Sequence, residues 1–232
     1  MLLGIIGAME SEIATLRSQL TDRSDLSVAG IAFYRGRLKG REAVISRCGI
    51  GKVHAAMCAQ LMIERFAPDL ILNIGVAGAL DERLDIADVV VAQSAVEHDM
   101  DTTSIGDPLG LISGPEVVHM PVDQAAAGCL KQVVLSIGKR CVVAAIATGD
   151  QFIERLEQKQ QIASRFGAAA CDMEGGAIAQ VCLENGVPYA AYRAISDTLN
   201  GNGLEYAVNV IPAAETSARV LEGFLQRWQN GV

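Results

Sequence analysis

The stretch that decides the fold runs from residue 141 to residue 196 and reads CVVAAIATGDQFIERLEQKQQIASRFGAAACDMEGGAIAQVCLENGVPYAAYRAIS. Its first part (141–149) is an apolar run typical of a buried strand, and a helix is expected at about 154–166. An alanine-rich segment with a helix at about 174–185 follows, and a second strand is expected at 187–196. Strands that alternate with helices in this way predict an α/β fold.

The rest of the chain continues this alternation around one hairpin. Alternating residues at 31–38 and 41–49, with a turn at Lys39–Gly40, predict two antiparallel strands, so the sheet is expected to be mixed. The other expected elements are a strand ending near Gly7, a helix from about Glu10, a helix at 52–66, strands at 69–78 and 88–96, a long irregular loop at 99–121, a helix at 123–137 and a terminal helix at 205–229. We therefore expect one domain over 1–232, with a central mixed, twisted β-sheet flanked by helices.

Charge and composition argue against several classes of partner. The formal net charge is −8 and aromatic residues make up only 4% of the chain, which disfavours nucleic acid or an anionic membrane surface. Glu10 and Glu12 interrupt the apolar N-terminal run, and no apolar run approaches the ~20 residues of a membrane-spanning helix. Neither a signal peptide nor a membrane span is expected. The six cysteines contain no CxxC pair, which favours reduced thiols in a cytoplasmic protein.

Polar and charged side chains gather at the ends of the expected strands. They are Glu10 and Glu12 after the first strand, Asp150 after the strand at 141–149, and Ser196 and Asp197 at the end of the strand that contains Arg193. Because open α/β sheets bind ligands at the carboxyl ends of their strands, these groups are expected to converge on one crevice. Helix capping explains any single carboxylate about equally well, but several of them with an arginine inside an apolar strand favour a site.

Two further acids, Asp172 and Glu174, stand in AAACDMEGGAIAQ (168–180), where small apolar neighbours predict burial. A buried carboxylate needs a partner, or its pKa shifts. The segment therefore raises the question of what these two acids contact.

Cofactor and metal motifs do not occur. GIGKV (49–53) lacks the first glycine and the final Ser or Thr of a phosphate loop, and neither GxGxxG nor GxSxG is present. The three histidines supply no zinc ligand set, even with Asp99 and Asp101 beside His98. The residues alone therefore indicate an α/β enzyme without metal or cofactor, using carboxylates for acid–base chemistry. Hydrolysis of a glycosidic or N-glycosidic bond fits this description.

Six segments carry a family resemblance over nearly the whole chain: GIIGAMESEI (4–13), GIGKVHAA (49–56), NIGVAGAL (73–80), ATGDQFI (147–153), DMEGGAIAQVC (172–182) and VPYAAYRAISD (187–197). In this order and spacing the chain resembles the 5′-methylthioadenosine/S-adenosylhomocysteine nucleosidases of the nucleoside phosphorylase superfamily. The resemblance implies hydrolysis of these two nucleosides to adenine and the 5-thioribose product, and hydrolysis of 5′-deoxyadenosine as well. It also implies a place in methionine salvage and in recycling the by-products of S-adenosylmethionine.

The resemblance implies a role for each acid. Glu12 matches the residue that deprotonates the attacking water, Arg193 matches an arginine that helps to hold this water, and Asp197 matches the acid that protonates adenine N7. Asp197 must then carry a proton when substrate is bound. Glu10 is expected to face solvent in the first turn of its helix, and Asp172 is expected to be structural, bonding backbone groups or capping the next helix.

The resemblance also implies the substrate contacts. Glu174 would bind the ribose hydroxyls, Met173 would pack against the sugar, Phe152 would lie over adenine and the backbone of Ile153 would read the purine edge. Further positions expected in the pocket are Met9, Ile50, Val76, Ala77, Gly78, Ser196 and Tyr206. The implied assembly is a homodimer in which the 99–121 loop, with Ile105 and Ser113, lies near the partner's active site.

Some residues depart from the family pattern. Val76 stands where the family often has serine, Leu199 alters the segment after Asp197, and Gly175 and Gly176 replace bulkier residues. The preference among methylthioadenosine, S-adenosylhomocysteine, 5′-deoxyadenosine and aminodeoxyfutalosine is therefore left open.

A phosphorylase and a non-catalytic nucleoside-binding protein are the main alternatives. Phosphate needs cationic or densely donating groups, but Asn73 stands where phosphorylases place an arginine, and Glu12 would repel the dianion. Hydrolysis is therefore preferred. The joint presence of Glu12, Glu174, Arg193 and Asp197 argues against a protein that binds nucleosides without turnover.

Overall fold

The structure, a computed structural model, describes residues 1–228. Its elements in this range are β1 (Leu3–Gly7), α1 (Glu10–Ser18), β2 (Thr21–Val28), β3 (Ile31–Leu38), β4 (Arg41–Arg47), α2 (Lys52–Phe66), β5 (Leu70–Asn73), β6 (Val76–Ala79), β7 (Val89–Glu97), the 3₁₀ helix η1 (Thr103–Ile105), β8 (Met120–Pro121), α3 (Gln124–Ser136), β9 (Cys141–Thr148), α4 (Leu156–Phe166), β10 (Ala168–Asp172), α5 (Gly175–Asn185), β11 (Tyr189–Asp197) and α6 (Gly203–Arg227). The predicted α/β alternation is confirmed.

One mixed sheet runs through the molecule in the order β2-β3-β4-β1-β5-β11-β6-β10-β9-β7-β8. β1 pairs in parallel with β4 and β5, whereas β3 is antiparallel to β2 and to β4, which confirms the predicted hairpin. β11 also pairs with β7, so β11, β6, β10, β9 and β7 close into a ring of five strands. The closed ring is what places the ends of β6, β10 and β11 around a common space.

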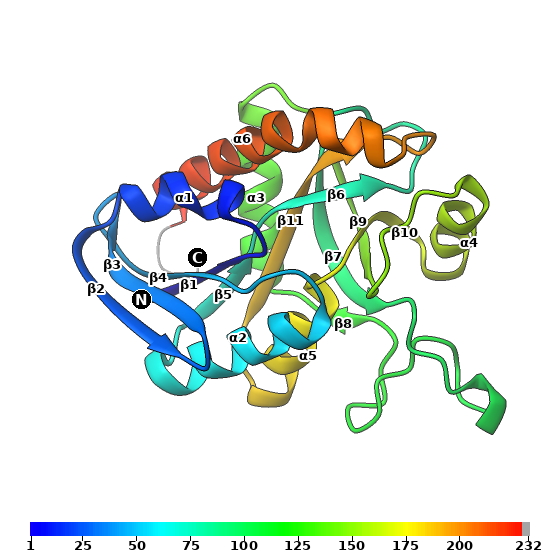
Figure 1. Cartoon of the computed structure of the whole chain (residues 1–232), viewed down its shortest axis with the longest axis horizontal. Helices are drawn as coiled ribbons and strands as arrows, with labels where there is room; N and C mark the ends of the chain where they lie inside the picture. The colour runs from blue at the N-terminus through cyan, green and yellow to red at the C-terminus, as the bar shows by residue number, and fades with distance from the viewer. Residues whose placement is uncertain (229–232) are drawn as a thin grey trace.

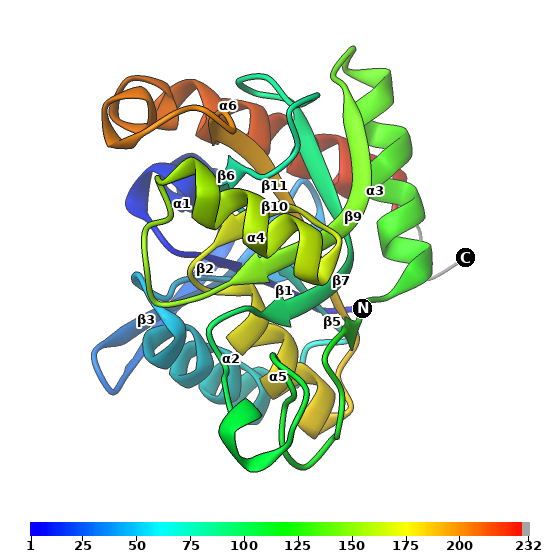
Figure 2. The ribbon, with the colours of Figure 1, turned by 90° about the vertical axis from the view of Figure 1, so that its right-hand side faces the viewer.

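Helices cover both faces of the sheet. In Figure 1, α1, α3 and α6 lie on one side of it, α2 and α5 lie on the other, and the 99–121 loop projects away from the body. Figure 2 shows α4 in front of β9 and β10, against which it packs. Because both faces are covered, every residue of β1 and β11 is buried.

The structure differs from the sequence-based expectation in several places. The strand expected at 69–78 is two strands, because the chain turns at Gly75, whose φ of 149° suits glycine. β2 and β10 were not predicted, since β2 is an exposed polar edge and β10 consists mostly of alanine. The terminal helix begins at Gly203, and its expected end at 229 lies outside the described residues.

Two global expectations can be compared with the structure. All six cysteines are free thiols and four of them are buried. Burial raises the pKa of Cys171 and of Cys182 to about 12, which keeps both thiols neutral. Within residues 1–228, no helix has the length and apolar character needed to cross a membrane.

Candidate active site

A cavity of about 310 Å³ collects residues from the carboxyl ends of β1, β4, β9, β10 and β11, from β6 and from α6. All predicted site residues except Arg193 line it. They are Met9, Glu12, Ile50, Val76, Ala77, Gly78, Phe152, Ile153, Met173, Glu174, Ser196, Asp197 and Tyr206. Ala8, Gln151, Cys171 and Asp172 complete the lining. Of the groups expected to converge at the strand ends, Glu12, Ser196 and Asp197 therefore share this cavity.

Glu12 is buried, with its carboxylate turned back over the start of its own helix. Its Oε2 accepts the backbone N–H groups of Ala8 (2.7 Å) and Met9 (2.9 Å), and its Oε1 accepts that of Val76 (3.1 Å). Burial raises the pKa of Glu12, while these N–H donors and the charge of Arg193 oppose the rise. A carboxylate has about four acceptor positions, so one position on Oε1 stays open for a further donor.

Asp197 is the last residue of β11 and is buried. Its Oδ1 accepts the hydroxyl of Ser196 (3.0 Å), and its Oδ2 accepts the ammonium of Lys159 (3.0 Å). A Cβ at Gly78 would stand 2.8 Å from Oδ2, so only glycine leaves room for the carboxylate there. Both oxygens of Asp197 are thus held in place from behind the cavity wall.

Glu174 precedes α5 and is held by a single backbone bond, from the N–H of Gly51 to Oε1 (2.9 Å). Burial, and then the charge of Asp172, raise the pKa of Glu174 to about 7. Its remaining acceptor positions have no donor within the described residues, which suits a carboxylate that receives ligand hydroxyls.

Arg193 is the predicted site residue that does not line the cavity. Its Nη2 binds Asp172 Oδ2 (2.5 Å) and Asn73 Oδ1, and its Nη1 donates to the carbonyl of Asn73 (3.1 Å). These partners hold the guanidinium outside the cavity lining. Arg193 acts on Glu12 through its positive charge, which lowers the pKa of Glu12. Arg193 therefore does not line the cavity, and its expected role in holding the water stays a prediction.

Asp172 is the carboxylate that neutralises Arg193. This ion pair supplies the partner that the buried Asp172 needs. Asp172 also accepts the hydroxyl of Thr148 (2.5 Å) and the N–H of Gly175 (3.2 Å), the first residue of α5. A Cβ at Gly175 would lie 2.6 Å from Asp172 Oδ2, so a larger residue there would displace the ion pair. The expected structural role of Asp172 agrees with these contacts.

The mouth of the cavity is apolar and aromatic. Phe152 is 47% exposed, and its ring meets that of Tyr206 edge to face, with centroids 5.4 Å apart. The Tyr206 hydroxyl lies 3.3 Å from the sulfur of Met9, and Ile50 is exposed beside this group. A ligand with an apolar end would therefore find contacts at the mouth.

Two of the residues that depart from the family pattern, Val76 and Leu199, differ in their relation to the cavity, which Val76 lines. Val76 bonds Glu12 through its main-chain N–H, which does not depend on the side chain. Leu199 does not line the cavity.

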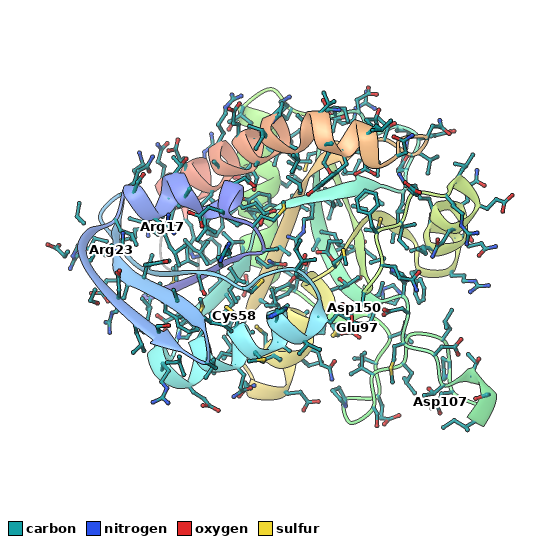
Figure 3. The ribbon with its side chains drawn as sticks, in the orientation of Figure 1. Arg17, Arg23, Cys58, Glu97, Asp107 and Asp150 are labelled. Atoms are coloured by element: carbon teal, nitrogen blue, oxygen red, sulfur yellow. The ribbon has the colours of Figure 1, made fainter. Side chains whose placement is uncertain are left out.

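Two acids at the ends of the expected strands, Asp150 and Glu10, do not line the cavity. Asp150 accepts the N–H of Lys52 (2.8 Å), the first residue of α2, and so caps that helix. Figure 3 shows it beside Glu97, which accepts the ammonium of Lys52 (2.9 Å). Glu10 pairs with Arg17 on the exposed face of α1, as expected for a solvent-facing acid. Within residues 1–228, no group of three or more His, Cys, Asp and Glu side chains is placed to hold a metal ion.

Lys159 is the residue that sequence reasoning missed. It lies on α4 with 0% of its surface exposed, although lysine is among the residues least often fully buried. A signal was present, because Lys159 precedes Ile162 by three residues and Phe166 by seven, which places it on the apolar face of the helix. Those three are the buried residues of α4.

The family model of the phosphorylase superfamily matches residues 2–226 of the chain. The 5′-methylthioadenosine/S-adenosylhomocysteine nucleosidase of Staphylococcus aureus (strain MRSA252) is 40% identical over 232 residues, which covers 97% of this chain and 100% of the relative. The solved S-adenosylhomocysteine nucleosidase of Streptococcus pyogenes, in complex with 5-methylthiotubericidin, superposes with a TM-score of 0.93 at 35% identity, covering 99% of this chain and 98% of that one.

A futalosine hydrolase of Helicobacter pylori superposes with a TM-score of 0.92 at 31% identity, covering 98% of each chain. The chain belongs to the phosphorylase superfamily and, within it, to the family of 5′-methylthioadenosine/S-adenosylhomocysteine nucleosidases.

Proposed function

We propose that this protein hydrolyses the N-glycosidic bond of 5′-methylthioadenosine and S-adenosylhomocysteine, and of 5′-deoxyadenosine, releasing adenine and the corresponding 5-substituted ribose. The relatives named 5′-methylthioadenosine/S-adenosylhomocysteine nucleosidase, at 40% identity over nearly the whole chain, support the proposal. The observation that carries it is one cavity with two differently held acids. Glu12 keeps an open acceptor position, and Asp197 is bonded to an ammonium.

In this proposal Glu12 takes a proton from water as the water attacks C1′ of the sugar. Burial raises the pKa of Glu12 and so makes it a stronger base than an exposed carboxylate. Asp197 protonates N7, so that adenine leaves as a neutral molecule. The carboxylates around the sugar also favour the positive charge that develops on it in the transition state.

Substrate binding in this proposal uses the remaining wall. Glu174 accepts the ribose hydroxyls, which supply the donors that its carboxylate lacks in the empty cavity. Met173 packs against the sugar, Phe152 lies over adenine and Ile153 reads the purine edge through its backbone. Arg193 contributes indirectly, by fixing Asp172 and by its charge on Glu12.

Water is a better nucleophile for this site than phosphate. The described lining contains four acids and no Lys, Arg or His, whereas a phosphate site needs cations or free donors. Asn73 is engaged with Arg193, and the N–H of Val76 is already used by Glu12. A dianion would therefore be repelled where a water molecule is accepted.

The proposed assembly is a cytoplasmic homodimer of single-domain chains (1–232), with the 99–121 loop near the partner's active site. Ile105 on this loop is 79% exposed, and Leu204 and Val208 on α6 are exposed as well. Exposed apolar side chains of this kind support an interface between copies of the chain.

The experiment that tests the proposal measures adenine release in phosphate-free buffer from four nucleosides side by side. They are methylthioadenosine, S-adenosylhomocysteine, 5′-deoxyadenosine and aminodeoxyfutalosine. We expect turnover of the first three, with kcat/KM highest for the two thioadenosines. Turnover of aminodeoxyfutalosine alone would instead favour the activity suggested by the futalosine hydrolase neighbour, and binding without turnover would favour a nucleoside-binding protein.

A further inference from the structure

Lys159 is a fully buried lysine whose ammonium meets the proposed acid. Its Nζ donates to Asp197 Oδ2 (3.0 Å), to the carbonyl of Thr198 (2.8 Å) and to the carbonyl of Gly201 (3.2 Å). These three bonds use all three ammonium protons. Of the three acceptors, only the carboxylate of Asp197 carries a charge.

The burial of Lys159 decides where the proton of this pair rests in the empty site. A buried ammonium without a counterion is strongly unfavourable, and so is a buried carboxylate without one. A proton on Asp197 would leave the Lys159 ammonium, 0% exposed, with no opposite charge in contact. The pair is therefore an ion pair, and the proton that adenine needs resides on Lys159.

We propose that Lys159 is a positioning residue that stores the leaving-group proton and delivers it through Asp197. This inference rests on the proposed function. As the bond between C1′ and N9 breaks, its electron pair passes to the purine and N7 becomes basic. The proton then moves from Nζ to Asp197 and from Asp197 to N7.

The step balances in charge and protons. Lys159 ends neutral, Asp197 ends as a carboxylate, Glu12 holds the proton taken from water, and adenine and the sugar leave as neutral molecules. When the products have left, a proton passes from Glu12 through solvent in the open cavity to Asp197, which lines the cavity, and from Asp197 back to Lys159. The net charge of the three side chains is the same before and after.

The other titratable groups around the pair do not compete for this proton. Cys171 of β10 faces both residues, and burial raises its pKa to about 12. Tyr206 of α6 faces Asp197, and burial raises its pKa as well. Glu205 of α6 is bonded to the N–H (2.6 Å) and hydroxyl (3.0 Å) of Thr198. The other strand packed against α4, β9, contributes alanines to the adjoining apolar cluster.

Lys159 also bonds two carbonyls of the loop between β11 and α6. An experiment on Lys159 must therefore distinguish proton delivery from stabilisation of the fold. Replacement by methionine removes the charge and keeps the length of the side chain. In Lys159→Met, Asp197 has lost its proton donor, so the proton for N7 must come from solvent, which supplies it more readily as the pH falls. The variant should therefore be active in acid and inactive at alkaline pH, a change that loss of structural support alone does not produce.

The experiment measures kcat and KM of wild type and Lys159→Met on methylthioadenosine at pH 5 and pH 8. Lys131→Met, at an exposed lysine of α3, is the matched control and should behave as wild type. We expect kcat of Lys159→Met to fall by about 100-fold or more at pH 8 and by less than about 10-fold at pH 5, with KM little changed.

A second substrate, the 4-nitrophenyl 5-methylthioriboside, has a leaving group that departs without a proton. Wild type and Lys159→Met should cleave it at rates within about threefold of each other, because no general acid is needed. Equal losses on both substrates, or a loss on methylthioadenosine that is the same at both pH values, would overturn the proposal. Wild-type protein that releases no adenine would instead overturn the proposed function itself.

Discussion

Replacing Glu174 by glutamine should stabilise the empty protein in a pH-dependent way. Burial and the charge of Asp172 raise the pKa of Glu174 to about 7 from an ordinary 4.5. Between these values the folded state binds more protons than the unfolded state, so wild-type stability falls as pH rises through this range. Glu174→Gln has no charge to bury, so its stability does not fall for this reason as the pH rises.

The size of the effect follows from the pKa shift. Raising the pH from 5 to 8 should cost the wild type about 2–3 kcal/mol through Glu174, and should cost the variant none of this. The amide oxygen of the variant can accept the N–H of Gly51 as the carboxylate does. Any effect of this bond on stability is the same at both pH values. For a chain of this length the difference in Tm between variant and wild type should thus grow by roughly 5–10 °C from pH 5 to pH 8.

The assay is thermal unfolding of both proteins without ligand at the two pH values. Glu184→Gln, an exposed position on the same helix, is the control and should show no such growth. A difference in Tm that is the same at pH 5 and pH 8 would refute the reasoning. The variant should also bind methylthioadenosine more weakly, since its amide cannot accept both ribose hydroxyls as the carboxylate does.

Four further outcomes are expected. Asp197→Asn should lower kcat on methylthioadenosine by at least about 100-fold while circular dichroism stays that of a folded protein, and near-normal turnover would exclude its acid role. Asp172→Asn should lower the free energy of unfolding by about 3–5 kcal/mol in urea titrations, because it leaves the buried Arg193 without a counterion; a loss below about 1 kcal/mol would contradict this. Gly75→Ala should lower activity more than Gly30→Ala, because a Cβ at Gly75 would stand 2.5 Å from the Glu12 carboxylate whereas one at Gly30 would meet open space. Equal losses of activity in the two variants would contradict this prediction. The pKa of Glu12 is raised, so kcat/KM should begin to fall in acid at a pH above 4.5, the ordinary pKa of a glutamate. A fall in kcat/KM that begins only at or below pH 4.5 would argue against Glu12 as the base.

Much of the fold could be predicted because its helices and central strands are strongly patterned. The helix at 52–66 matches α2, and the hairpin is present with its predicted turn. The closure of β11 onto β7 could not be predicted, because it depends on pairings between strands far apart in the chain. β2 was missed because an exposed edge strand needs no apolar alternation.

The site was predicted best where the family resemblance fixed a residue by its position in the chain. Glu12, Glu174 and Asp197 all line the cavity, and the resemblance placed them there by position. Arg193 and Lys159 were harder, because the sequence shows a charge but not what neutralises it. Each has its carboxylate partner far away along the chain, Asp172 for Arg193 and Asp197 for Lys159.

The central claim is that water and not phosphate attacks the sugar. The most direct measurement incubates the protein with methylthioadenosine in excess inorganic phosphate and identifies the sugar product by ³¹P NMR and mass spectrometry. The account predicts free 5-methylthioribose in the same amount as adenine, with no new phosphorus signal. Formation of 5-methylthioribose 1-phosphate would contradict it.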